Sequence, residues 1–205
     1  WDEYIVCYSA YTLGRMREQR AVEPLIALLQ TSSPKIRNAA VTALGNIQDA
    51  RAVGFLIKIL QDDEPIVQGT NNNDPPLKDT AVDSLSAIGA PAVEPLIGVL
   101  QGRDEYAAFY AASALSNILD TRAKEVLDAG MNEGRLSVIA GAHRYYILEG
   151  KEDTQDNLVS ALNEYGNGTI AYNYLNCGNY KLESAASARS EEHTSELPVT
   201  VRNLV

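Results

Sequence analysis

Few side chains in this 205-residue chain have the chemistry for catalysis or metal binding. His143 is the only histidine before residue 189, and the two cysteines are Cys7 and Cys177. A Cys–His dyad would need a thiol to approach His143, and a metal centre would need further ligands at fixed spacing. The sequence contains neither a glycine-rich phosphate loop nor a zinc-ligand spacing. We therefore expect no catalytic residue, no metal and no cofactor, and we expect His143 to be structural or merely exposed.

A polar insert over residues 65–78 carries the first candidate contact residues. Its centre, GTNNNDPPLK, is rich in asparagine and broken by proline, which is typical of a surface loop. It lacks the alternating oxygen ligands and the downstream glutamate of a calcium loop. The insert is either a tolerated surface loop or a contact with a partner. In the second case the contact residues are Asn71, Asn72, Asn73 and Asp74.

Tyrosine is unevenly distributed, because eight of the eleven tyrosines lie between Tyr106 and Tyr180. Tyrosine combines an apolar ring with a polar tip and is enriched at protein interfaces. We therefore expect a recognition surface in this half of the chain. An alternative stays open, in which several of these rings fill the core and the first two form an ordinary pair on one helix face. The expected partner-contacting tyrosines are Tyr106, Tyr110, Tyr145, Tyr146, Tyr172 and Tyr174.

The elements that must position these residues form an internal repeat. The hexapeptide AVEPLI occurs at residues 21–26 and 92–97, with a divergent copy, AVGFLI, at residues 52–57. Each copy follows a segment built around a leucine, and these leucines are spaced by 31, 41 and 30 residues: Leu13, Leu44, Leu85 and Leu115. A unit of about thirty residues therefore recurs, with one insertion.

Both halves of the unit have a helical apolar period. In the second half the apolar residues fall at i, i+3, i+4 and i+7, as in Val22, Leu25, Ile26 and Leu29. Asp49 is placed to cap a second helix, and so is Asp120. The residue after each key leucine is small, which predicts close helix crossings at Gly14, Gly45, Ser86 and Ser116.

A helical hairpin of this size cannot bury its apolar stripe alone, so successive hairpins must stack. The predicted fold is all-α, an α-solenoid of stacked antiparallel helical hairpins in a right-handed superhelix. The segments ALGNIQDARAVGFLIKIL and SLSAIGAPAVEPLIGVL resemble HEAT repeats, of the short HEAT-like type named after phycobilisome lyases. The resemblance is specific over residues 8–101. A fifth hairpin is expected from LSVIAGAHRYYILEG and DTQDNLVSALNEYG, and a sixth begins at TIAYNYLNCGNYKLESAASA.

The two ends of the chain do not follow the repeat. Trp1 stands within a helical pattern, so we expect further residues to precede it. Residues 189–197 can be back-translated into the adapter of short-read sequencing libraries, and later residues match its continuation. We expect residues 1–188 to be a single solenoid fragment from an assembled environmental read, and residues 189–205 to be a non-natural tail. A natural acidic tail is the alternative.

The net charge of the chain limits the kinds of macromolecule that it could bind. The chain has 17 Lys and Arg against 27 Asp and Glu, a formal net charge of −10. Such a field repels phosphate backbones, which disfavours nucleic acid and a HEAT-like DNA glycosylase. No apolar window is long enough for a membrane span. We expect a cytoplasmic protein.

These observations favour a non-enzymatic scaffold that binds a partner protein along the concave face of the solenoid, which the second helices would line. The family resemblance implies an alternative, a phycobilin lyase or lyase-like chaperone subunit that handles a bilin chromophore and a phycobiliprotein.

Overall fold

The computed structural model describes residues 2–62, 76–150 and 154–192, with side chains as far as residue 189. All regular structure in these ranges is helical, and η marks a single 3-10 turn. In chain order the elements are α1 (Glu3–Arg15), η1 (Gln19–Ala21), α2 (Val22–Leu28), α3 (Pro34–Ile47), η2 (Ala50–Ala52), α4 (Val53–Gln61), α5 (Leu77–Ile88), α6 (Ala90–Leu100), α7 (Glu105–Ile118), α8 (Thr121–Asn132), α9 (Leu136–Gly141), α10 (His143–Glu149), α11 (Gln155–Tyr165), α12 (Gly168–Leu175) and α13 (Tyr180–Glu192).

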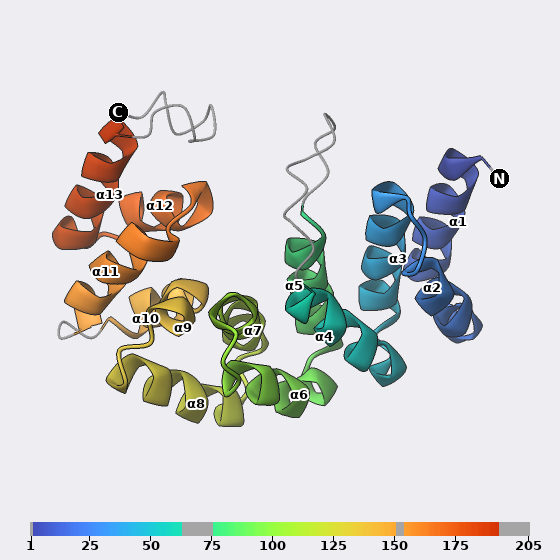
Figure 1. Ribbon diagram of the computed structural model, residues 1–205, viewed down its shortest axis with the longest axis horizontal. Coiled ribbons are helices and arrows are strands. Elements are labelled where there is room, and N and C mark those ends of the chain that lie inside the picture. Colours follow the sequence, from blue (N-terminus) through green and yellow to red (C-terminus); the bar gives the residue numbers. More distant parts are fainter. Residues whose placement is uncertain (1, 63–75, 151–153, 193–205) are drawn as a thin grey trace.

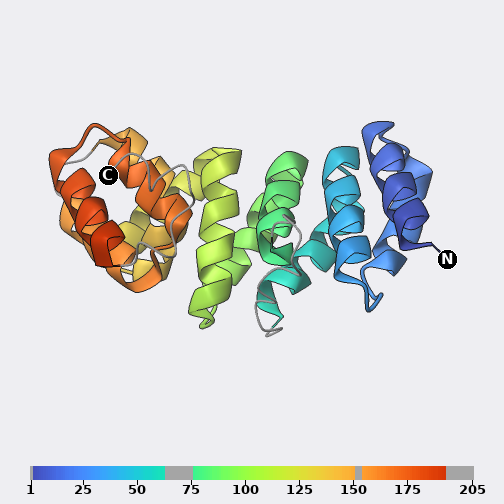
Figure 2. The ribbon, with the colours of Figure 1, turned by 90° about the horizontal axis from the view of Figure 1, so that it is seen from above.

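The first eight helices form the four repeat units that the sequence predicts. The pairs α1/α2, α3/α4, α5/α6 and α7/α8 are hairpins, and each hairpin packs on the next. Figure 1 shows the elements following one another around an arc that ends at α13, and Figure 2 shows α1, α3, α5 and α7 standing in a row. The chain is an all-α solenoid, as predicted.

A continuous apolar core runs between the two layers of helices. Each fully buried leucine contributes about 2 kcal/mol relative to an exposed one. Because neighbouring hairpins complete the core, no hairpin is stable alone. The core includes the predicted stripes of the second helices and the key leucines of α3, α5 and α7: Leu25, Ile26, Leu56, Ile57, Leu96, Ile97, Leu44, Leu85 and Leu115.

Small side chains let neighbouring first helices approach closely. A Cβ atom added to Gly14 would lie 2.7 Å from the Cα of Ala43, and one added to Gly45 would lie 2.7 Å from the Cα of Ser84. Packed atoms do not approach so closely, so both positions require glycine. The buried hydroxyl of Ser84 donates a hydrogen bond to the carbonyl of Val41 at 2.9 Å. The predicted close crossings are confirmed at Gly14 and Gly45.

The first helices line the inner side of the arc. Figure 1 shows α1, α3, α5, α7 and α9 on the inside and α2, α4, α6 and α8 on the outside. The prediction that second helices line the concave face is therefore wrong. The first helices pack extensively on one another through small residues, whereas the second helices, with large apolar residues, make fewer contacts among themselves. Because interaxial distance grows with the side chains at the contact, the closer-packed layer becomes the inner one.

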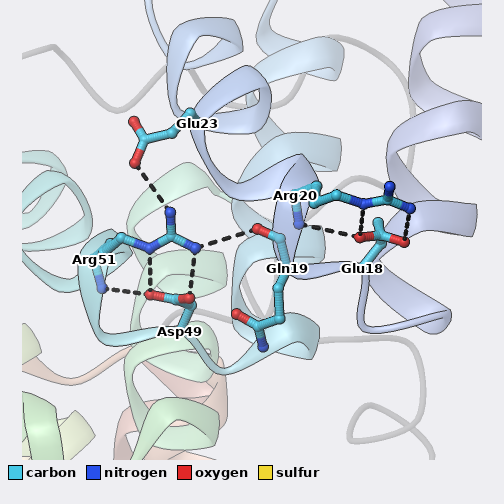
Figure 3. A network of polar contacts seen from close by, with 6 residues as sticks. All are labelled: Glu18, Gln19, Arg20, Glu23, Asp49 and Arg51. Atoms are coloured by element: carbon cyan, nitrogen blue, oxygen red, sulfur yellow. Dashed lines mark hydrogen bonds and ion pairs between the residues drawn. The ribbon is translucent and has the colours of Figure 1, made fainter.

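Polar contacts join the first two hairpins. Asp49 accepts a hydrogen bond from the backbone nitrogen of Arg51 at 2.8 Å and also binds the guanidinium. It caps the 3-10 turn η2 that leads into α4, whereas the prediction placed this cap on the second helix itself. Arg51 then reaches back to Glu23 at 3.4 Å and to the carbonyl of Gln19 at 3.2 Å, as Figure 3 shows. One arginine thus connects the turn of its own hairpin to the hairpin before it.

The same arrangement recurs in the fourth hairpin. Asp120 caps α8 and binds Arg122, which reaches Glu94 of the preceding hairpin at 2.9 Å. Between the second and third hairpins both halves are replaced, because Gly54 stands at the glutamate position and residues 89–91 read Gly-Ala-Pro. The arginine–glutamate contact between successive hairpins therefore occurs at the junctions where the sequence supplies both the arginine and the glutamate.

The C-terminal third departs from the predicted pairing. The sequence predicted one helix over LSVIAGAHRYYILEG paired with the segment that follows. Instead the chain bends at Ala142, and the short helices α9 and α10 together take the place of the fifth hairpin. At Gly141 an added Cβ would lie 2.1 Å from the carbonyl oxygen of Phe109, so α9 is held tightly on α7. Helix α11 packs on α9 as the next first helix, and α13 packs on α11 and α12.

The structure describes parts of both the predicted insert and the predicted tail. Most of the predicted insert lies outside the described residues, but Leu77 and Lys78, its last two residues, already belong to α5. Helix α13 continues through the first residues of the predicted tail to Glu192. Arg189 donates hydrogen bonds to the carbonyls of Asn163 and Gly166 at 3.0 and 2.9 Å. Residues 193–205 lie outside the described residues.

Candidate partner-binding surface

Several of the predicted contact residues do not meet on one surface. The four residues of the polar insert, Asn71, Asn72, Asn73 and Asp74, lie outside the described residues. Tyr172 is half-exposed on α12, and within the described part of the chain no ring contact joins it to the other predicted tyrosines. The candidate surface must therefore be built from the tyrosines of other helices.

Three of the predicted tyrosines belong to the core, which corrects their assignment to a partner surface. Tyr145, Tyr146 and Tyr174 are all buried. The hydroxyl of Tyr146 donates to the carbonyl of Leu127 at 2.6 Å, and that of Tyr174 donates to the carbonyl of Leu158 at 3.0 Å. Burial raises the pKa of both phenols. Their rings belong to the apolar core of the C-terminal units, so the alternative core interpretation holds for these three.

Tyr106 and Tyr110 lie on α7 with a different orientation. Tyr106 stands nine residues, or two and a half helical turns, before Leu115, so it lies on the opposite side of the helix from that buried leucine. Since Leu115 faces the core between the layers, Tyr106 faces the inside of the arc, and its side chain is 68 % exposed. Tyr4 has the same position relative to Leu13 on α1. The inner layer thus presents tyrosine at equivalent places in the first and fourth units.

Four aromatic rings gather on the inner side of the solenoid: Tyr106, Phe109, Tyr110 and Tyr165. We call them the aromatic patch. Tyr165, the last residue of α11, meets the rings of Tyr106 and Phe109 at centroid distances of 6.2 and 6.4 Å. Phe109 and Tyr110 meet edge to face at 5.2 Å. Such pairs stabilise one another by about 1 kcal/mol each, so the rings are ordered before any partner binds.

A cation of the chain itself already uses this patch. The ammonium of Lys78 lies 5.6 Å from the centre of the Tyr110 ring, within the range of a cation–π contact. It also donates a hydrogen bond to the carbonyl of Leu60, at the end of α4, at 3.1 Å. The hydrogen bond fixes the ammonium in place. The aromatic patch therefore already holds a cationic group of the chain against one of its rings.

Asp79 and Asp83 lie one turn apart on α5, and Asp79 lies near Tyr110 of the patch. Burial raises the pKa of both carboxyls, and the charge of Asp83 adds to the shift of Asp79. Burial also raises the pKa of Tyr110 to about 12, and the nearby charge of Asp79 contributes. Glu105, in contrast, is paired with Arg135 at 3.1 Å. Within the described ranges no cation forms a salt bridge with Asp79 or Asp83, so their negative charge is uncompensated.

His143 has a structural geometry, in line with one of the two roles that the sequence predicts. Its Nδ1 lies 2.8 Å from the carbonyl oxygen of Ala140, and Asn173 donates its side-chain amide to Nε2 at 2.8 Å. The ring is therefore neutral, with its proton on Nδ1. Burial lowers the pKa of His143 to about 4. Both nitrogens are engaged, and the ring joins the start of α10 to α12.

Other reactive groups are dispersed. Cys7 and Cys177 are both partly buried, and no disulfide joins them. In the portion of the chain that the structure describes, no three His, Cys, Asp or Glu side chains come together as metal ligands. The same portion contains no helix that is long and apolar enough to cross a membrane.

Four residues of this surface are not among the contact residues that the sequence predicts. Phe109 and Tyr165 complete the rings, and Asp79 and Asp83 supply the charge. The signal for Phe109 was its position beside Tyr110, and the signal for the aspartates was their spacing of four residues on an inner helix. Tyr165 was visible only as part of the tyrosine-rich half, because its contact with α7 depends on how α11 packs over α9.

Two comparisons with known proteins found similar sequences or structures. The family model described as HEAT repeats matches residues 1–70. Among solved structures, the chain is similar to a designed armadillo repeat protein, YIII(Dq)4CqI, at 19% sequence identity and a TM-score of 0.38; the match covers 90% of this chain and 92% of that chain. No curated protein matches. The family match ends within the polar insert, and the stacked hairpins continue beyond it.

Proposed function

We propose that this HEAT-like solenoid is an interaction scaffold that binds a partner protein through the inner side of its arc. The observation that carries the proposal is the aromatic patch, whose rings lie on the inner layer and include a tyrosine that is 68 % exposed. Exposed, clustered aromatic rings mark interaction sites because an unpartnered apolar surface of this kind is costly in water. Tyrosine also loses little conformational entropy when it becomes buried against a partner.

A narrower alternative follows from the resemblance to repeats of the phycobilisome-lyase type. In that case the aromatic patch would stack against the conjugated system of an open-chain tetrapyrrole. The uncompensated charges of Asp79 and Asp83 disfavour this occupant, since a bilin carries negatively charged propionates. If a bilin binds, its visible absorbance should change in a saturable way as the protein is added, and the Tyr106→Ala variant should not cause this change. That result would favour the bilin alternative over a protein partner.

We also infer that residues 189–205 are a translated adapter, as their back-translation indicates. The aromatic patch contains no residue of this segment, although Arg189 donates hydrogen bonds to carbonyls on either side of Tyr165. An independent copy of the gene that continues naturally past Arg189 would overturn this inference.

The test of the scaffold function is a selection of displayed random peptides on the full chain. The matched pair of variants is Tyr106→Ala on the inner layer and Phe55→Ala on α4 of the outer layer, where Phe55 is 38 % exposed. We expect selected peptides to bind the wild type and Phe55→Ala alike and to lose binding to Tyr106→Ala. Peptides that bind both variants equally, or a selection that enriches nothing, would contradict the proposal.

A further inference from the structure

We infer that the aromatic patch, together with Asp79 and Asp83, recognises an arginine- or lysine-containing segment of the partner protein. This inference rests on the proposed function and narrows its partner to one chemistry. The patch offers both components that bind a cationic side chain, namely aromatic faces and carboxylates, within one stretch of the inner layer.

The first argument is the contact that the chain makes with itself. Lys78 places its ammonium 5.6 Å from the centre of the Tyr110 ring, although it already has a carbonyl acceptor in Leu60. The patch therefore holds a cation against an aromatic face in the free protein. Tyr106 and Tyr165, which meet at 6.2 Å, provide further faces without a cation of the chain over them among the described contacts.

The second argument is the charge beside these rings. Two like charges one turn apart on a helix destabilise it, and Asp79 and Asp83 stand in this relation. The pKa of Asp79 is raised by burial and by the charge of Asp83, and among the described residues no salt bridge reaches either carboxylate. A cation from a partner would remove this repulsion. Glu105 lies near the same rings but is already neutralised by Arg135.

The third argument concerns the choice between the two basic residues. A guanidinium is planar, stacks on aromatic rings and can donate to two carboxylates at once, whereas an ammonium is a strongly hydrated point charge. With the Asp79 carboxylate near the rings and Asp83 one turn further along α5, the patch fits arginine better than lysine. The net charge of −10 also steers a basic segment toward the protein from a distance and makes the association sensitive to salt.

The experiment uses fluorescein-labelled peptides of the same length, (Gly-Arg)6, (Gly-Lys)6 and (Gly-Glu)6, titrated with the full chain and followed by fluorescence anisotropy. The test variant, Asp79→Asn with Asp83→Asn, removes two charges without changing shape. Its matched control is Glu125→Gln with Glu133→Gln, which removes two exposed charges on and just after α8 in the outer layer. Circular dichroism and urea unfolding show that each variant is folded, and the aspartate variant should keep its stability because it relieves a repulsion.

We expect the arginine peptide to bind more tightly than the lysine peptide, and the glutamate peptide not to bind. The aspartate variant should weaken the arginine peptide at least about tenfold, and the control less than about twofold. Tyr106→Ala should weaken it about fivefold. Equal losses in the two charge variants would show attraction by overall acidity and overturn the inference, as would no binding of the arginine peptide. Displayed peptides that depend on Tyr106 but carry no basic residue would overturn this inference and leave the scaffold function standing.

Discussion

Acidification should destabilise the C-terminal units through His143. Burial lowers the pKa of this imidazole from its ordinary 6.5 to about 4, although the hydrogen bond to the carbonyl of Ala140 opposes the shift. The unfolded chain therefore binds a proton at a higher pH than the folded chain does. The stability that His143 contributes is complete above pH 6.5 and is lost as the pH falls toward 4.

The size of the effect follows from the shift. Each pKa unit corresponds to 1.36 kcal/mol, so the loss between pH 7 and pH 4 is about 3 kcal/mol, with a slope of about 1.4 kcal/mol per pH unit inside the window. Asp79 and Asp83 act in the opposite direction, because their raised pKa values make protonation favour the folded chain. The charge of Arg144 adds a smaller contribution to the shift of His143.

The assay is urea unfolding between pH 4 and pH 8 of the wild type and of His143→Gln, followed by circular dichroism of the helices. Glutamine can donate to the carbonyl of Ala140 and accept from Asn173, but it does not titrate. The aspartates are common to both proteins, so the difference between the two stability curves isolates His143. We expect the free energy of unfolding of the wild type, relative to that of His143→Gln, to fall by about 3 kcal/mol from pH 7 to pH 4. Parallel curves, or an imidazole that titrates near 6.5 by NMR, would refute the reasoning.

Two further substitutions test the packing. Gly45→Ala should destabilise the chain by about 1–3 kcal/mol in urea unfolding, because the new methyl would overlap the backbone of Ser84, whereas Gly98→Ala, with open space around it, should stabilise α6 by up to about 1 kcal/mol. A neutral Gly45→Ala would mean that the helices do not cross so closely. Tyr146→Phe should cost about 1 kcal/mol by the same measurement, since it removes the hydrogen bond to the carbonyl of Leu127; an unchanged unfolding midpoint would contradict a role for that hydroxyl.

The spacing of Leu13, Leu44, Leu85 and Leu115 was enough to predict the hairpins, because a recurring apolar stripe can be buried only by a neighbouring copy of itself. Which layer lies inside was not predictable in the same way. That outcome depends on the relative spacing within each layer, which follows from contacts such as Gly14 with Ala43 between different units. A small residue in one helix indicates a close crossing but does not identify the helix that it crosses.

The tyrosine-rich half also shows why the candidate site could be predicted only in part from the sequence. Tyr106 and Tyr146 are the same residue type on neighbouring units, yet one is exposed and the other is buried. The repeat register separates them, because Tyr106 can be placed relative to Leu115, whereas the units after α8 lack a key leucine from which Tyr146 could be placed.

The buried tyrosines also explain how the solenoid continues after its repeat has degenerated. In the first units, contacts such as Arg51 with Glu23 join successive hairpins at the surface. In the last units Tyr146 reaches a carbonyl of α8, and Tyr174 reaches one of α11. A buried hydroxyl that is bonded to a helix carbonyl fixes position as well as filling volume, since any other placement would leave a polar group unsatisfied. Tyr146 therefore holds α10 on α8, and Tyr174 holds α12 on α11. Helix α11 itself packs on α9, and Tyr165 at its end meets the ring of Tyr106 on α7, which completes the aromatic patch.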